Sequence, residues 1–314
     1  HAEAWLRSGG AATCIVNMMT VVHKDSGGTV IFFPDVCLTP APPAPPIPIP
    51  YPNIDPVMLE IGPIAIRWYG LAYVAGFIVA GLVTRSLIKR WKVALTDDDL
   101  LDIVLAAVIG LVAGARIGYV VFYGVGAYWD DPLSILAFWD GGMSFHGGLA
   151  WIMLAGWLVA RRKGIPVLQL FDLGAVGAPL GIFFGRVANF INGELWGRTT
   201  DVPWGMVFPR APGDLPRHPS QLYEAVLEGL VIFCVLWVLS RRKRGDGLIV
   251  GTLLVLYAVF RTGIEFFREP DAQLGFIFGS LTMGQLLTLP LLFAGGWLVW
   301  RALASERAEA EDTP

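Results

Sequence analysis

The chain has 314 residues, of which 55% are hydrophobic and only 16% are charged. Its mean hydropathy is +0.59. The apolar residues gather in blocks of roughly 18 to 24, and each block is long enough as a helix to cross a hydrocarbon core of about 30 Å. This composition excludes a soluble globular protein and predicts a polytopic membrane protein. The net charge of -3 excludes a nucleic-acid scaffold, because phosphate binding needs a basic surface.

The N-terminal region, residues 1–50, ends in a proline-rich run at residues 40–50. Such a run forms a stiff, extended spacer. We interpret residues 1–50, which begin with His1, as an appendage that comes from a fragment or a fusion. Residues 51–303 are expected to form the membrane domain. Residues 304–314 are acidic and are expected to form a disordered cytoplasmic tail.

Seven apolar blocks predict seven transmembrane helices. Lipid offers backbone groups no hydrogen-bonding partner, and the alternating pattern of a membrane β-barrel is missing, so the fold class is an all-α bundle. The expected spans are residues 64–85, 100–123, 145–160, 168–191, 221–239, 248–267 and 283–303. Residues 196–219, rich in Pro, Gly and Arg, are expected to form a small head loop on the external, periplasmic side.

Basic residues are concentrated in every second connection between these spans. This pattern predicts the orientation of the spans. The basic residues follow the first, third and fifth spans, as Arg85, Lys89, Arg90, Lys92, Arg161, Arg162, Lys163, Arg241, Arg242, Lys243 and Arg244. Acidic residues mark other connections, as Asp130, Asp131, Asp140, Glu269 and Asp271. Connections rich in Lys and Arg stay in the cytoplasm. The N-terminus is therefore expected outside and the C-terminus inside.

Polar side chains recur near the outer ends of the expected spans, where each needs a partner or a water-filled cavity. They are Tyr69, Arg116, His146, Arg186, Asn189, Glu224, Arg261 and Glu265. Singly, each also has a structural explanation. Arg261 and Glu265 can neutralise one another at spacing i, i+4, Arg186 can reach the headgroups, and Tyr69 can belong to an aromatic belt. Their common depth, within roughly 10 Å of the outer boundary, predicts one shared site.

The residue types at this level fit an anionic lipid headgroup. Arginine holds phosphate through paired hydrogen bonds and keeps its charge. A histidine ordinarily titrates near pH 6.5 and can accept a proton at neutral pH. His146 could instead be a hydrogen-bonded interfacial histidine, and Arg116 a counter-ion of Glu224 or Glu265. We expect nucleophilic attack on a lipid, with arginines stabilising the departing phosphate.

The residues that other classes of membrane enzyme need are missing from this chain. A serine protease of the rhomboid type needs Gly-x-Ser-Gly, which residues 142–145, Gly-Met-Ser-Phe, do not provide. Aspartyl peptidases need two intramembrane aspartates at one level, and the expected spans contain no such pair. Four histidines, and three cysteines without Cys-x-x-Cys spacing, predict neither a metal site nor a cofactor. A lipid-binding or lipid-transporting bundle without catalysis remains the alternative.

Residues 185–198 read Gly-Arg-Val-Ala-Asn-Phe-Ile-Asn-Gly-Glu-Leu-Trp-Gly-Arg. This segment resembles the signature of the bacterial prolipoprotein diacylglyceryl transferases. Five further blocks resemble the same family and follow its order, at residues 67–71, 114–119, 139–149, 217–224 and 260–271. The resemblance covers about residues 53 to 303 and leaves residues 1–50 without a counterpart.

The resemblance implies an activity and a location. The diacylglyceryl group of phosphatidylglycerol passes to the thiol of the lipobox cysteine in a preprolipoprotein. The reaction forms a thioether and releases glycerol 1-phosphate, without a metal or cofactor. The enzyme is expected to lie in the bacterial inner membrane, with its active site toward the periplasmic leaflet.

The resemblance also implies roles for single residues. The substrate-binding set is Arg116, Arg186, Asn189, Glu194, Gly197, Glu224, Arg261 and Glu265, and the catalytic set is Tyr69, His146, Arg186 and Arg261. Arg186 and Arg261 are expected to hold the lipid phosphate, and Glu265 to orient Arg261. His146 is the expected base for the substrate thiol, although water or the leaving phosphate could take the proton instead. Gly197 is expected to let the head approach closely.

Overall fold

The computed structural model describes residues 49–311 except 63, 123–127, 129–130, 137–141, 270–275 and 279–280. The expected appendage therefore falls almost wholly outside the described residues, as do Asp130, Asp140 and Asp271. In chain order the elements are β1 (Val57–Ile61), β2 (Ile64–Arg67), α1 (Trp68–Trp91), α2 (Asp97–Phe122), the 3-10 helix η1 (Pro132–Leu136), α3 (Phe145–Lys163), α4 (Val167–Ile191), α5 (Ser220–Glu224), the π-helix η3 (Ala225–Val231), α6 (Ile232–Leu239), α7 (Leu248–Ile264), β3 (Phe276–Phe278), β4 (Leu281–Thr282) and α8 (Met283–Glu311).

Five helices in the described part of the chain are long and apolar enough to cross a membrane. They are α1, α2, α4, α8 and the continuous helix Ser220–Leu239, which joins α5, η3 and α6. Helix α7 is apolar but has only 17 residues, and α3 ends in the basic residues Arg161, Arg162 and Lys163. The predicted helical, multi-pass membrane protein is confirmed. The number of seven spans and their orientation stay predictions.

Two expected boundaries were wrong. Residues 64–67, expected in the first span, form strand β2, which pairs antiparallel with β1 through Leu59–Ile66 and Ile61–Ile64. The β-branched Ile64 and Ile66 alternate with Ala65 and Arg67, which favours a strand over a helix. At the other end, α8 continues through Glu311 where a disordered tail was expected, because alanine and glutamate there are strong helix formers.

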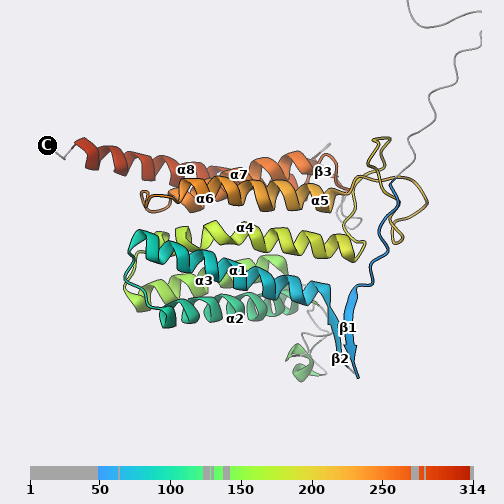
Figure 1. The fold of residues 1–314 in the computed structure, drawn as a ribbon, viewed down its shortest axis with the longest axis horizontal. Coiled ribbons are helices and arrows are strands. Elements are labelled where there is room, and N and C mark those ends of the chain that lie inside the picture. The colour runs from blue at the N-terminus through green and yellow to red at the C-terminus, as the bar shows by residue number, and fades with distance from the viewer. Residues whose placement is uncertain are drawn as a thin grey trace, which may run out of the picture. The chain divides into compact units, whose positions relative to one another are not determined.

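Helix α4 lies between two groups of helices (Figure 1), with α1, α2 and α3 on one side and α5 to α8 on the other. Its residues Leu173 and Val176 are fully buried and pack in a core with Ile232, Leu236 and Ile249. Helices α2 and α3 meet backbone to backbone, because a Cβ on Gly147 would lie 2.4 Å from the carbonyl oxygen of Gly114. Small residues allow such close approach between membrane helices. The arrangement brings the ends of α4, α5 and α7 together.

The non-helical segment between α4 and α5 is held in place by contacts at several points. Isolated bridges join Gly197 to Arg268 and Thr199 to Arg217. The hydroxyl of Tyr51 donates to the carbonyl oxygen of Phe190 at 2.6 Å, and thereby anchors the start of the described chain to the end of α4. These contacts hold the segment over the site described next.

Candidate functional site

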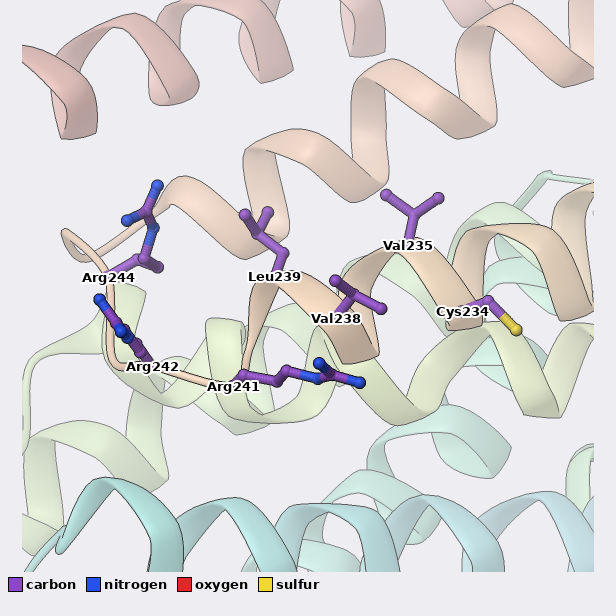
Figure 2. A pocket seen from close by; sticks show the side chains of 7 residues that line it. All are labelled: Cys234, Val235, Val238, Leu239, Arg241, Arg242 and Arg244. Carbon is purple, nitrogen blue, oxygen red and sulfur yellow. The ribbon is translucent and has the colours of Figure 1, made fainter.

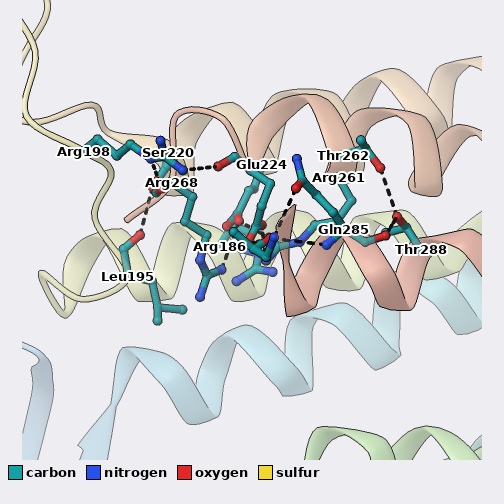
Figure 3. A network of polar contacts seen from close by, with 12 residues as sticks. Arg186, Leu195, Arg198, Ser220, Glu224, Arg261, Thr262, Arg268, Gln285 and Thr288 are labelled. Atoms are coloured by element: carbon teal, nitrogen blue, oxygen red, sulfur yellow. Dashed lines mark hydrogen bonds and ion pairs between the residues drawn. The ribbon is translucent and has the colours of Figure 1, made fainter. Parts of the chain in front are cut away.

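Three arginines surround one fully buried carboxylate, that of Glu224 on α5 (Figure 3). The Nε atom of Arg186, from α4, lies 2.9 Å from Oε2 of Glu224. Arg261, from α7, pairs with Oε1 through Nη1. The Nη1 atom of Arg268, just beyond α7, lies 3.2 Å from the same Oε1. Glu224 is therefore the centre at which two helices and the chain after α7 meet.

Local structure explains why Glu224 lies at this level. Helix α5 begins at Ser220, directly after Pro219, so that Glu224 stands one turn into the helix. The hydroxyl of Ser220 donates to the carbonyl oxygen of Leu195 at 2.9 Å, and the side-chain amide of Gln221 donates to the carbonyl oxygen of Glu194. The start of α5 is thus bound to the segment that follows α4.

Glu265 provides a second carboxylate for Arg261. Its Oε2 lies 2.9 Å from Nη2 of Arg261, and the hydroxyl of Thr282 donates to its Oε1 at 3.0 Å. The two terminal nitrogens of Arg261 therefore point at two different carboxylates, Glu224 and Glu265. Only a planar guanidinium can bridge both in this manner.

The ion-paired cluster carries an excess of positive charge. Three arginines, at positions 186, 261 and 268, are paired with two glutamates, at positions 224 and 265. The formal balance of these five groups is one positive charge, and a third buried carboxylate, that of Glu228, interacts electrostatically with all three arginines and cancels this excess when it is ionised. Removing one partner from a buried ion pair leaves an uncompensated charge, which is costly in a membrane interior. A monoanionic ligand would balance the cluster.

A row of hydrogen-bonded amide and carboxylate side chains extends from Arg186 towards the end of α4. The side-chain amide nitrogen of Asn189 donates to Oε1 of Glu194 at 2.8 Å, and that of Asn192 donates to the same oxygen at 3.1 Å. Asn189 in turn accepts a long contact from Arg186 at 3.5 Å. Gly193, with φ of 63°, ends the helix in the left-handed conformation that suits glycine and turns Glu194 back towards Asn189.

Gly197 lies where three segments of chain meet. A Cβ at this position would lie 2.5 Å from the carbonyl oxygen of Phe267 and 2.7 Å from Cβ of His218. The amide of Gly197 donates to the carbonyl oxygen of His218 at 2.8 Å. Only glycine fits here, and the contact sets the backbone next to Arg268.

Arg116 has partners other than the expected ones. Its guanidinium donates to the carbonyl oxygens of Ile135 at 2.8 Å and Ser134 at 2.7 Å, and to that of Gly142 at 3.2 Å. Glu224 and Glu265, the carboxylates proposed for it, are paired with arginines of α4 and α7 and of the chain after α7. Arg116 therefore holds the connection between α2 and α3, because carbonyl oxygens there lie in its reach.

Tyr69 and His146 come from helices on the other side of α4. Tyr69 is the second residue of α1, and its hydroxyl lies 3.3 Å from that of Tyr73. Its side chain lies near those of Arg186 and Glu194, which places it beside the cluster. His146 is exposed in the first turn of α3. The structure thus brings Arg186, Asn189, Glu194, Glu224, Arg261 and Glu265 together, with Gly197 beside them, and does not join Arg116 to them.

Arg268 is the member of the cluster that sequence reasoning missed. Its side chain is 10% exposed, and its carbonyl oxygen accepts a hydrogen bond from Nε of Arg198 at 2.9 Å. It lies outside helix α7, so helical periodicity could not place it. Its position within the block at residues 260–271 was the available signal.

An apolar cavity adjoins the cluster on the side of α5 and α7. It measures about 340 Å³ and is lined by Tyr223, Leu227, Val259, Phe260, Gly263, Ile264 and Phe267. At its rim the hydroxyl of Tyr223 accepts from Nε1 of Trp204 at 2.6 Å and lies 3.1 Å from Nδ1 of His218. Burial lowers the pKa of His218, which favours its neutral form. In the described residues no cluster of His, Cys, Asp and Glu could hold a metal ion.

Comparison with known proteins identifies the family of this chain. The family model described as prolipoprotein diacylglyceryl transferase matches residues 56–301. The chain belongs to this family. A phosphatidylglycerol–prolipoprotein diacylglyceryl transferase of Allorhizobium ampelinum is 52% identical over 271 residues, which cover 83% of this chain and 94% of the relative. One of Geobacter sulfurreducens with the same name is 50% identical over 257 residues, or 82% and 98% of the two chains.

The family match places the cluster within the shared part of the chain. A third relative of the same name, from Nitratidesulfovibrio vulgaris, is 49% identical over 254 residues, which cover 79% of this chain and 95% of its own. The family model ends before the last turns of α8 and begins in the loop before β1. All the residues around Glu224 therefore belong to the transferase region.

Proposed function

We propose that this membrane transferase moves the diacylglyceryl group of phosphatidylglycerol onto the cysteine thiol of a prolipoprotein, the first step of bacterial lipoprotein maturation. The bond between glycerol C3 and its phosphate oxygen breaks, and a thioether forms at that carbon. Glycerol 1-phosphate leaves, and the thiol proton passes to an acceptor. The observation that carries the proposal is the meeting of three arginines at the buried carboxylate of Glu224.

The charge balance of the cluster suits this substrate. The phosphodiester of phosphatidylglycerol carries one negative charge, which matches the excess on the ion-paired arginines. As the bond to carbon breaks, negative charge grows on the departing phosphate. Fixed arginine donors stabilise such a transition state, and loss of one donor of this type costs about 3 kcal/mol in the barrier.

The roles of single residues follow from their positions. Arg186 and Arg261 hold the phosphate, Glu224 and Glu265 hold the two arginines in place, and Arg268 adds charge to the same point. Asn189 and Glu194 shape the headgroup site next to Arg186. Tyr69 closes it from α1. The apolar cavity between α5 and α7 offers room for acyl chain next to the charged headgroup.

His146 is proposed as the acceptor of the thiol proton. A thiol reacts as its thiolate, and its ordinary pKa near 8.5 means that a base accelerates attack at neutral pH. His146 is exposed at the outer end of α3, where a substrate peptide can reach it. The nucleophile comes from the lipobox cysteine of the substrate, so the chain's own cysteines take no part.

The proposed topology has seven spans, with the N-terminus outside, the C-terminus inside and the site toward the periplasmic leaflet of the inner membrane. Helices α3 and α7 complete the five longer helices as spans, because each runs beside a longer apolar helix, α2 and α8 respectively. The basic ends of α1, α3 and α6 face the cytoplasm. Single cysteines placed after Lys163 and after Pro209 test this topology. Their accessibility to an impermeant maleimide should differ between intact spheroplasts and inverted vesicles.

The activity is tested with purified protein in phosphatidylglycerol vesicles and a synthetic lipobox peptide. Mass spectrometry should show the peptide gaining one diacylglyceryl group, with stoichiometric release of glycerol phosphate. A peptide in which the lipobox cysteine is replaced by serine is the control and should stay unmodified. Lipid binding or lipid transfer between vesicles without any modified peptide would instead support a non-catalytic lipid-handling bundle.

A further inference from the structure

A second lipid-sized hollow lies at the far end of the helix that carries Glu224. It measures about 670 Å³ and is lined by Cys234, Val235, Val238, Leu239, Arg241, Arg242 and Arg244. Arg241 follows Glu224 by 17 positions in the sequence, which at about 1.5 Å per residue separates them by roughly 25 Å. The hollow is therefore distinct from the arginine cluster around Glu224.

The wall of this hollow has the chemistry of an acyl-chain groove. Cys234, Val235 and Val238 are exposed on one face of α6, at positions that a helix places side by side. Leu239 completes the apolar surface at the end of the helix. Figure 2 shows Arg241 beside the apolar residues, with Arg242 and Arg244 at the end of the groove. An apolar wall that ends in arginines matches a phospholipid, which has apolar tails below a charged head.

The arginines at the end of the groove have spare hydrogen-bonding capacity. Among the described residues, the exposed guanidinium groups of Arg241 and Arg242 make no ion pair or hydrogen bond. Arg244 forms a longer ion pair, because its Nε lies 3.7 Å from Oε1 of Glu306, and this buried Nε has no hydrogen-bond acceptor.

Two basic residues on neighbouring helices are already used in ion pairs. Lys163, at the end of α3, pairs with Asp99 and Asp102, and Arg85 on α1 pairs with Asp97. Trp91, at the end of α1, donates to the carbonyl oxygen of Ser240 at 2.9 Å, so these helix ends lie at the same level as the groove. Arg241 and Arg242 differ from these basic residues because they keep their charge for a ligand, and they do so beside an apolar groove.

We propose that this groove binds an anionic phospholipid of the membrane leaflet opposite to the transfer site, with one acyl chain along Val235 and Val238 and the phosphate at Arg241, Arg242 and Arg244. The groove prefers a headgroup with net negative charge, because a zwitterionic lipid carries a compensating cation. Basic residues near a membrane surface each favour anionic lipid by about fivefold. The site is separate from the transfer reaction and does not depend on it.

The test uses Cys234 as a local reporter. With Cys14 and Cys37 replaced by serine, Cys234 is the single cysteine of the chain, and a bimane label on it reports lipid in the groove. Vesicles contain phosphatidylglycerol or phosphatidylcholine with brominated chains, which quench the label on contact. We expect phosphatidylglycerol to reach half-maximal quenching at a mole fraction about fivefold or more below that of phosphatidylcholine.

Two double variants separate the groove from general surface charge. Arg241→Gln with Arg242→Gln should bring the two lipids to equal quenching. The matched control, Arg161→Gln with Arg162→Gln, removes the same charge from the end of α3 and should keep the preference. Equal quenching by both lipids in the parent protein, a preserved preference in the groove variant, or an equal loss in the control would each overturn the proposal. Peptide modification is measured in parallel and is expected to persist in both variants, so failure of the groove and failure of the transfer reaction are separate results.

Discussion

Arg186 of α4 and Arg261 of α7 bind the two different oxygens of one buried carboxylate, that of Glu224. The two guanidinium groups are therefore held apart by the width of a single carboxylate. This separation suits two donors that act on neighbouring oxygens of one phosphate. The relationship makes Glu224 a positioning residue for both arginines, and the predictions below follow from it.

Glu224→Gln is expected to lower both stability and activity. The substitution removes the buried counter-charge that Arg186, Arg261 and Arg268 share, and breaking a buried ion pair costs about 3 to 5 kcal/mol. Thermal unfolding in detergent should show a clear fall in Tm, and peptide modification should fall by about 100-fold or more. Glu228→Gln is the comparison, because Glu228 is also fully buried on the same helix and near the same arginines but forms no ion pair among the described residues, so its effect should be smaller. Equal effects of the two substitutions would contradict the positioning role of Glu224.

Arg261→Lys is expected to be nearly as damaging as Arg261→Ala. The guanidinium bridges Glu224 and Glu265 through separate nitrogens, and a lysine ammonium is a single point that cannot do both. Loss of about 3 kcal/mol of transition-state stabilisation corresponds to roughly 100-fold in rate. Initial rates of peptide modification measure this loss, with Arg162→Lys, on an exposed surface, as the control. Full activity of the Arg261→Lys protein would contradict the argument that Arg261 must bind two carboxylates at once.

His146→Asn is expected to slow turnover and leave lipid binding intact. A histidine base takes the thiol proton during the attack, so its loss should lower the rate throughout the neutral range. Rates between pH 6 and 8 and binding of phosphatidylglycerol check the two parts. His218→Asn is the control. Burial lowers the pKa of His218 and favours its neutral form, but its ring faces Tyr223, so its loss should not slow turnover in the same way. A parent-like profile in the His146 variant would assign the proton to water or to the leaving phosphate.

Gly197→Ala is expected to disturb the site through the backbone. The added Cβ would lie 2.5 Å from the carbonyl oxygen of Phe267, which must move and carry Arg268 with it. Overpacking of this kind costs about 1 to 3 kcal/mol, and activity should fall by at least about tenfold. Gly185→Ala provides the comparison, because a Cβ there meets nothing within 4 Å and alanine favours a helix. Similar losses in both variants would show that the crowding at Gly197 is not the cause.

The helices could be predicted because their signal is local. An apolar block of about 20 residues has one stable arrangement in lipid, and every expected span coincides with a helix of the structure. The errors lie at boundaries, where local preferences are close in energy. Residues 64–67 pair as a strand with β1, and the Ala- and Glu-rich end of α8 remains helical to Glu311.

The residues of the site could be predicted from their expected depth in the membrane. Which residue pairs with which could not be predicted. Arg186, Glu224, Arg261 and Glu265 each stand out as a charge near one end of an apolar block. Arg116 shares that property, yet its guanidinium is used by carbonyl oxygens of the α2–α3 connection. Depth along a helix axis says nothing about which way a side chain faces around that axis.

By itself, the sequence determined that this is a helical membrane protein with charged side chains gathered at one level, because hydrophobic length and the cost of buried charge are properties of each segment alone. Its motifs also identified the family. Only the tertiary structure decided that Glu224 is the shared partner of Arg186, Arg261 and Arg268. The reason is that ion pairing depends on how α4, α5 and α7 rotate and pack against one another, and that choice is made by contacts between residues far apart in the chain.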